Sequence, residues 1–186
     1  MKIAFLSRFY GKRYRGAETF VQELSQNLLR MGHKVNIYPD SSYIDGQPEI
    51  IVSTNGRWDV FSARVKSWRG KLKLVVPGQS GPGWDDRLNL YSFPDVFVGF
   101  TNYQCRWAKS VNPFVKVVKI PNGVDLLKFG DKVKPLDANL PHPVVLNVAA
   151  LEPIKRLDLL IRAVAKTNLS LLLCGQGSEY EKLNDL

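Results

Sequence analysis

Short apolar runs alternate with longer amphipathic stretches along the first two thirds of the chain. Between the first two runs, Phe20, Leu24 and Leu28 recur every four residues, which predicts a helix over 16–31. The apolar runs predict strands over 2–7, 35–38, 49–54, 72–76, 95–100 and 115–120. Strands that alternate with helices predict an α/β domain with a Rossmann-like, doubly wound parallel sheet, because helical crossovers then cover both faces.

Two more helices are predicted within this domain. The first follows from residues at three- and four-residue spacing: Trp58, Phe61, Val65 and Trp68. Because this helix lies between two strands and must cover the sheet, we expect its aromatic stripe to belong to the core. The second helix runs through Lys109, since Thr101 and Gln104 have the spacing of a capping box.

The pattern breaks after residue 125 and then restarts. Residues 126–141 carry prolines and charges without a lasting period, which predicts a linker. Strands are predicted over 144–149 and 169–174, with a helix marked by Leu157, Leu160, Ile161 and Val164 between them and a capping box at Ser178 and Glu181 after them. We therefore expect an N-terminal domain over 1–125 and, over 142–186, the incomplete start of a second Rossmann-like domain, because so few elements cannot cover a parallel sheet.

Composition narrows the classes of partner and compartment. A net charge of +9 and a pI near 9.6 favour an anionic partner, and a phosphorylated ligand, an acidic lipid surface and a nucleic acid all satisfy that condition. Cys105 and Cys174 lie far apart without metal-ligand spacing, which predicts reduced, buried thiols and no metal site. The chain shows neither a long apolar run nor a signal-peptide pattern at Met1, so we expect a cytoplasmic protein.

The loop between the first strand and the first helix is basic and contains a glycine. Such a loop brings cations and the free N–H groups of a helix start to the carboxyl edge of the sheet, where anions bind well. A second loop, residues 78–83, contains three glycines and follows a central strand. We expect it to face segment 8–16 across the point where the strand order reverses.

Four stretches together carry a resemblance to a known family. They are Arg15–Glu18, Ile120–Asp125, Leu151–Leu160 and Gly175–Gly177. In this order and spacing the sequence resembles retaining glycosyltransferases of the GT-B fold, of the family-four type. The resemblance implies two Rossmann-like domains around a donor cleft, and transfer of a sugar from a nucleotide-sugar to a glycan, lipid-linked or small-molecule acceptor without a metal or other cofactor.

The same resemblance assigns candidate donor-site residues. Lys155 would contact the donor diphosphate, and Gly16 would let the loop of the first domain approach it. The family usually carries Gly-Arg where this chain has Ala149-Ala150, so we expect Arg156 to substitute for the missing arginine. Plain alternatives exist, namely a solvated lysine for Lys155 and a flexible turn for Gly16.

Candidate acceptor-side residues lie in the first domain: Arg15, Glu18, Asn55, Gln79 and Ser80. Glu18 has an alternative explanation, because an acidic residue in a first helical turn is favoured by the helix dipole alone. Neither His33 nor His142 is placed for general-base work, which fits a mechanism in which the donor phosphate takes the acceptor proton. No catalytic residue is assigned.

Several further expectations follow. In the family the glutamate-rich motif that grips the donor sugar comes after the position of Leu186, so we expect this chain to be inactive alone. Segment 12–15 and the helix over 58–68 are candidates for contact with an anionic membrane, which would place the protein at the inner membrane face. A non-catalytic GT-B-like protein that binds phosphate or glycans is the alternative. Nucleic-acid binding is not expected without a recognised motif, and Ser7–Gly11 does not match the dehydrogenase fingerprint.

Overall fold

The structure is a computed structural model that describes residues 1–12, 16–126 and 139–186. The chain divides into two compact units, Met1–Val124 and Asp125–Leu186, and each is described by itself. Most of the linker predicted over 126–141 lies outside the described residues.

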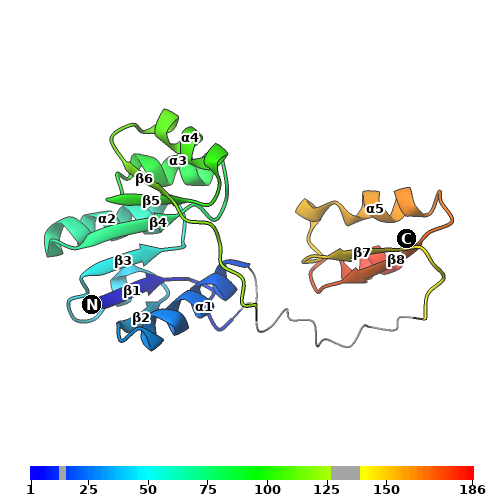
Figure 1. Ribbon diagram of the computed structural model, residues 1–186, viewed down its shortest axis with the longest axis horizontal. Coiled ribbons are helices and arrows are strands. Elements are labelled where there is room, and N and C mark those ends of the chain that lie inside the picture. Colours follow the sequence, from blue (N-terminus) through cyan, green and yellow to red (C-terminus); the bar gives the residue numbers. More distant parts are fainter. Residues whose placement is uncertain (13–15, 127–138) are drawn as a thin grey trace. The chain divides into compact units, whose positions relative to one another are not determined.

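The first unit contains a sheet of six strands, all parallel, in the order β2-β1-β3-β4-β5-β6 (Figure 1). Its strands are β1 Lys2–Leu6, β2 Lys34–Tyr38, β3 Ile50–Ser53, β4 Lys73–Pro77, β5 Val96–Gly99 and β6 Lys116–Lys119. The predicted α/β class and the parallel sheet are confirmed. Each strand lies within a residue or two of the range expected from its apolar run.

Helices connect these strands: α1 Gly16–Arg30, α2 Trp58–Gly70, α3 Trp84–Tyr91 and α4 Asn102–Val111, with a 3₁₀ turn, η1, at Ser41–Tyr43. The sequence pattern did not predict α3. The side chains that α3 buries are Asp86, Asn89 and Leu90, so two of the three are polar and the helix presents no apolar stripe to the sheet. An apolar period therefore could not reveal it.

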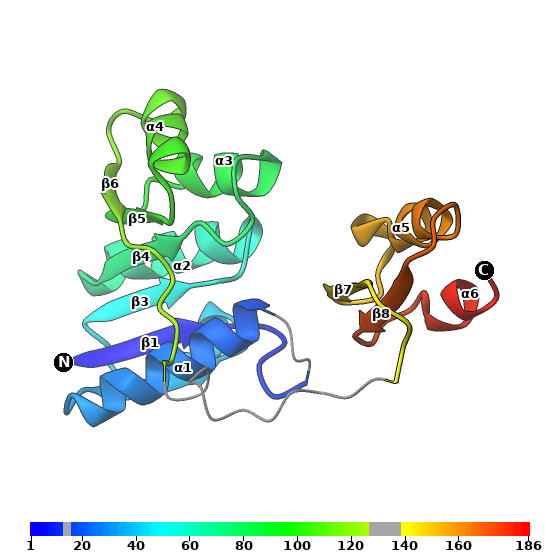
Figure 2. The same ribbon diagram turned by 45° about the vertical axis from the view of Figure 1, so that its right-hand side comes forward.

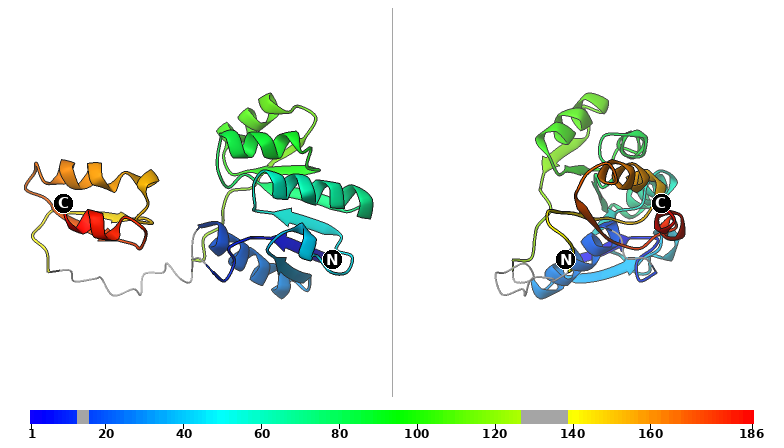
Figure 3. Two further views of the ribbon diagram at one scale, coloured as in Figure 1. Left: turned by 180° about the vertical axis from the view of Figure 1, so that it is seen from behind. Right: turned by 90° about the vertical axis from the view of Figure 1, so that its right-hand side faces the viewer.

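The helices cover the two faces of the sheet unequally. On one face α1 lies along β1 and β2 (Figure 2), where Val21 packs with Ile3 and Phe5. The opposite face carries α2, α3 and α4, as the rear view shows for α2 (Figure 3), and it holds the larger core. Buried members of that core include Leu6, Ile51, Val60, Leu74, Leu90, Phe97 and Ala108. The strands, whose carboxyl ends carry the loops of the candidate site, are thus packed against a buried apolar core.

The prediction that the aromatic stripe of α2 belongs to the core is wrong. The buried residues of α2 are small: Val60, Ala63 and Ser67. The aromatic residues face solvent instead, with exposed fractions of 80% for Trp58, 49% for Phe61 and 60% for Trp68. Small side chains let α2 pack closely on β3 and β4, and this leaves no room for indole rings beneath it.

The capping box predicted for α4 is half formed. The Thr101 hydroxyl accepts a hydrogen bond from the backbone N–H of Gln104 at 3.1 Å, as an N-cap should. The Gln104 side chain does not return to the N-cap. Its Oε1 accepts from the backbone N–H of Phe100 at 2.8 Å, and its amide nitrogen turns toward Gly78.

The second unit has a sheet of two parallel strands, β7 Val144–Val148 and β8 Ser170–Cys174. They are joined by a 3₁₀ turn, η2 Pro153–Lys155, and α5 Leu157–Val164, and α6 Tyr180–Asn184 follows β8. Leu151, Leu157 and Leu183 form its core.

Two local predictions in or near this unit are wrong. The capping box at Ser178 is not formed: Glu179 is the N-cap of α6 and makes no side-chain cap bond, and its backbone N–H donates to the Leu151 carbonyl at 2.9 Å. The two thiols are free as expected, but Cys105 and Cys174 are half-buried rather than buried.

Candidate functional site

The reversal of strand order in the first unit lies between β1 and β3, because β1 pairs with β2 on one side and with β3 on the other. The loops that follow these strands meet at the carboxyl edge of the sheet, which is where ligands bind in open parallel sheets. Loop 78–83 follows β4, one strand further along. Because β3 lies between β1 and β4, the loop after β3 separates loop 78–83 from segment 8–12 along the edge of the sheet.

Asn55 joins three of these loops. Its side-chain oxygen accepts a hydrogen bond from the backbone N–H of Arg8 at 2.9 Å, and its amide nitrogen donates to the Pro39 carbonyl at 2.7 Å. Beside it, the Thr54 hydroxyl donates to the Leu6 carbonyl at 2.9 Å. Asn55 was predicted to contact a hydroxyl group of the acceptor substrate. The hydrogen bonds observed for it instead connect the loops after β1, β2 and β3.

At this junction the described part of the chain provides a cation, Arg8. Its guanidinium contacts the carboxylate of Asp59, in the first turn of α2, at 2.7 Å. The Arg8 side chain is more than half exposed, whereas that of Asp59 is largely covered. Burial raises the pKa of Asp59, and the positive charge of Arg8 opposes that rise. Sequence reasoning noted the basic loop but did not single out Arg8.

Two predicted acceptor-side residues carry buried polar atoms that lack a hydrogen-bond partner within the described part of the chain. They are Oε2 of Glu18, in the first turn of α1, and Nε2 of Gln79, directly after β4. An unsatisfied buried polar atom costs free energy, so its persistence in a fold suggests a ligand or water that completes it. Oε2 of Glu18 can accept a hydrogen bond and Nε2 of Gln79 can donate one, and a hydroxyl group can be the partner of either atom.

The remaining candidates at this edge are more open. Gly16 is exposed as the first residue of α1, and a Cβ added to it would meet no atom of the described residues within 4 Å. Protein packing therefore does not require a glycine at Gly16. Ser80 is exposed on the loop after β4. Arg15 lies outside the described residues.

A buried polar cluster of Asp86, Asn89 and Gln104 is hydrogen-bonded to the start of loop 78–83. Asp86 is 1% exposed and accepts hydrogen bonds from the side-chain amides of Asn89 and Gln104, each at 3.3 Å. Gln104 also donates to the Gly78 carbonyl at 2.7 Å. A Cβ at Gly78 would lie 2.2 Å from the Gln104 amide nitrogen, so only glycine fits there.

Burial in this cluster raises the pKa of Asp86 to about 6, against the hydrogen bonds from Asn89 and Gln104 that lower it. Sequence reasoning missed Asp86 together with α3. The signal that could have found both is an acidic pair, Asp85 and Asp86, shortly after Gly83, because acidic residues are favoured in a first helical turn.

At the carboxyl edge of the second unit, the loops after β7 and β8 are held against each other by backbone hydrogen bonds. The N–H of Leu151 donates to the Gln176 carbonyl at 2.9 Å. A Cβ at Gly175 would come within 1.8 Å of the Ala149 carbonyl oxygen, and one at Gly177 within 2.3 Å of the Leu151 carbonyl oxygen. Both glycines are needed for this close approach. The structure thus brings together two stretches singled out in the sequence, Leu151–Leu160 and Gly175–Gly177.

Lys155 and Arg156 lie at the start of α5 on this edge, and both are exposed. Arg156 is the N-cap residue, with a left-handed φ of 50°, and its Nε lies 3.4 Å from the Asp158 carboxylate. The hydrogen bond from Arg156 lowers the pKa of Asp158. Lys155 forms no ion pair with any residue that the structure describes. Two cations beside a helix N-terminus suit a phosphate.

Comparisons with known proteins add no family to this picture. No family model matches the chain, and no curated protein matches it. Within residues 1–12, 16–126 and 139–186, no group of three or more His, Cys, Asp or Glu side chains could hold a metal ion. None of the helices described is long and apolar enough to cross a membrane.

Proposed function

We propose that this chain is the acceptor-side domain and the start of the donor-side domain of a retaining GT-B glycosyltransferase. Its reaction would be transfer of a sugar from a nucleotide-sugar to a hydroxylated acceptor. In this reaction the bond between sugar and diphosphate breaks, and negative charge grows on the leaving phosphates. Without a metal, cations and helix N-termini must stabilise that charge.

The observation that carries the proposal is the arrangement around α5. Backbone contacts between the loops after β7 and β8 fix the chain that leads into Lys155 and Arg156. The two cations and the helix start then lie on one edge, with Lys155 unpaired among the described residues. A diphosphate is a ligand that would use all three features.

The unsatisfied atoms of the first unit support a hydroxylated acceptor. Oε2 of Glu18 is a hydrogen-bond acceptor and Nε2 of Gln79 is a donor, and hydroxyl groups interact with both kinds of atom. Arg8 and Asn55 shape the neighbouring loops, so we assign them a positioning role at this site.

Ala150 favours a second candidate, a non-catalytic protein of the same architecture that binds phosphate or glycans. The resemblance expects an arginine here, and its absence removes one cation from the phosphate site. A panel of nucleotide-sugars separates the two when it is assayed with a protein that also carries the glutamate-rich motif of the family: release of nucleoside diphosphate indicates an enzyme, and binding without release indicates a binding protein.

The first test is titration of the 186-residue chain with UDP, ADP and GDP by calorimetry. Lys155→Ala removes a charge-assisted contact and should weaken binding about tenfold or more, since hydrogen bonds to charged groups contribute about 1.5–3 kcal/mol. Lys166→Ala is the matched control, because Lys166 is an exposed lysine just past the other end of α5. No binding of any of the three diphosphates, or equal losses in both variants, would contradict the proposal.

A further inference from the structure

Helices α2 and α3 both expose most of their large side chains to solvent, and apart from Leu90 of α3 the side chains that they bury are small or polar. On α3 the exposed residues are Trp84 at 77%, Tyr91 at 53% and Leu88 at 40%, while Asp86 and Asn89 are buried. On α2 the exposed aromatics are Trp58, Phe61 and Trp68. Three of the four tryptophans of the chain therefore lie on the exposed sides of these two helices. Surface-exposed apolar residues gathered in this way usually mark an interaction site.

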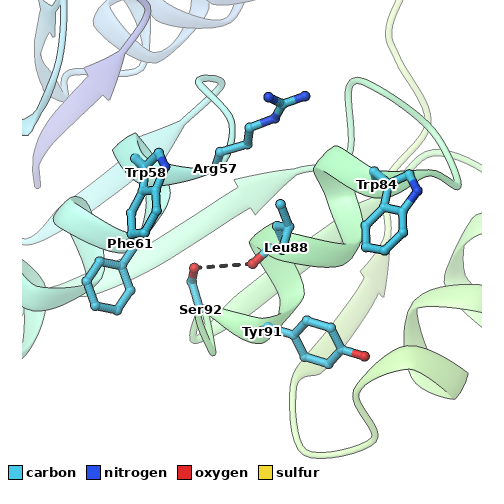
Figure 4. A pocket seen from close by; sticks show the side chains of 7 residues that line it. All are labelled: Arg57, Trp58, Phe61, Trp84, Leu88, Tyr91 and Ser92. Atoms are coloured by element: carbon cyan, nitrogen blue, oxygen red, sulfur yellow. Dashed lines mark hydrogen bonds between the residues drawn. The ribbon is translucent and has the colours of Figure 1, made fainter.

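Four of the exposed aromatics line a hollow between the two helices, and Trp68 is not among them (Figure 4). Its volume is about 500 Å³, and its lining residues are Arg57, Trp58, Phe61, Trp84, Leu88, Tyr91 and Ser92. We call these seven residues the aromatic surface. Trp58 and Phe61 contact each other edge to face, with ring centroids 6.2 Å apart. Trp84 lies across the hollow from them, beside Leu88 and Tyr91.

Helix α2, on one side of the aromatic surface, is rich in basic residues, whereas α3 on the other side has Asp85 and Asp86 against Arg87. Between residues 57 and 71 the chain has five basic residues and one acidic residue. Two of the five are used inside the fold: Arg64 contacts Asp95 at 2.7 Å, and Lys66 donates to the carbonyls of Ser41 and Ile44. Arg69 and Lys71 remain exposed at the end of α2.

Aromatic rings and cations are also interleaved. The guanidinium of Arg87 lies over the Trp84 ring, 6.0 Å from its centroid, and that of Arg64 lies 4.8 Å from the Trp68 ring. Arg57 borders the hollow and contacts Asp85 at 2.6 Å. Arg87 thus places a positive charge beside an exposed indole ring, while the charges of Arg64 and Arg57 are paired with Asp95 and Asp85.

We propose that the aromatic surface binds the surface of an anionic lipid bilayer. Tryptophan and tyrosine, with an apolar body and a polar end, are the side chains enriched at membrane–water interfaces. Anionic headgroups attract the cations at its border and the net charge of +9. A protein partner with an apolar site would need no such excess of cations.

The test is cosedimentation of the full chain with vesicles of phosphatidylcholine alone and of phosphatidylcholine with phosphatidylglycerol, at low and high salt. We expect binding to the anionic vesicles, weakened by salt, and a blue shift of the tryptophan emission. The variant Trp58→Gln/Trp84→Gln should lose at least tenfold in the partition coefficient. Phe114→Gln is its control, because Phe114 is an aromatic residue, 87% exposed, outside the aromatic surface.

A second pair of variants tests the charge. Arg69→Gln/Arg87→Gln should weaken binding about 25-fold, at about fivefold for each cation, or about 1 kcal/mol near an anionic surface. Arg106→Gln/Lys109→Gln on α4 changes the net charge equally and should have a smaller effect. Urea unfolding followed by circular dichroism checks that each variant folds.

Three results would overturn the proposal. The first is that the wild type does not bind anionic vesicles at low salt. The second is that Trp58→Gln/Trp84→Gln and Phe114→Gln bind equally well. The third is that the protein forms a dimer that covers the aromatic surface. Sedimentation equilibrium would detect the last as self-association that Trp58→Gln/Trp84→Gln abolishes.

Discussion

Asp86 offers the sharpest test of the buried cluster under loop 78–83. Its carboxyl group is 1% exposed and has a pKa of about 6, raised by burial from the value near 4 of a free side chain. A carboxyl group whose pKa is higher in the folded state binds a proton more readily there than in the unfolded chain. Ionisation of Asp86 therefore costs stability as the pH rises from about 4 to about 6.

The magnitude follows from the shift of about two pKa units, each equal to about 1.4 kcal/mol. Between pH 4 and pH 7, ionisation of Asp86 should lower the free energy of unfolding by about 2 to 3 kcal/mol. Asp86→Asn keeps the shape and cannot ionise. We therefore subtract the free energy of unfolding of the variant from that of the wild type at each pH. This difference should fall by about 2 to 3 kcal/mol between pH 4 and pH 7, whatever its value at pH 4.

Urea unfolding monitored by tryptophan fluorescence measures this difference. All four tryptophans lie within Met1–Val124, so the signal reports the unit that contains Asp86. Asp85→Asn is the matched control, because Asp85 is a neighbouring aspartate whose side chain is 42% exposed and contacts Arg57 on the surface. Parallel stability curves for wild type and Asp86→Asn from pH 4 to pH 7 would refute this account of the cluster.

Two further predictions concern stability. Gly175→Ala places a Cβ 1.8 Å from the Ala149 carbonyl oxygen and should destabilise the second unit by about 3 kcal/mol or more. Gly123→Ala meets no atom of the described residues within 4 Å and should be nearly neutral, and the chemical-shift dispersion of the second unit distinguishes the two variants. Burial raises the pKa of Asp95, but hydrogen bonds from the Leu74 N–H and two cations outweigh it, so the pKa is lowered overall. Asp95→Ala should therefore cost about 2 kcal/mol at pH 7, and the loss should shrink as the pH falls below about 4, which urea titrations at both pH values would check.

The apolar pattern predicted the strands well because parallel strands are buried on both sides and read as continuous apolar runs. It placed α1 correctly for a similar reason, since Phe20, Leu24 and Leu28 do pack toward the sheet. The pattern failed on α2 and α3, where large apolar residues face solvent. Amphipathic spacing predicts a helix but does not say which stripe is buried, and in α2 the buried residues are the small ones, Val60, Ala63 and Ser67.

The candidate site divides in the same way. Spacing and resemblance selected Lys155, Gly175 and Gly177, whose loops the fold of the second unit brings together. The roles of Asn55 and Asp86 depend on contacts with residues distant in sequence, from Asn55 to Arg8 and from Asp86 to Gln104. Such contacts leave no local pattern, because they come from the order of strands in the sheet.

Gln104 has a consequence for how the first unit can move. Its side-chain amide bonds to the Gly78 carbonyl, the Asp86 carboxylate and the Phe100 N–H, and its backbone lies in the first turn of α4. A displacement of the glycine loop must therefore break a bond to α4 or carry the end of that helix along. Motion on ligand binding would then be shared by the loop and two helices, and the amide protons of Phe100 and Gln104 should exchange with solvent at rates that report on the loop.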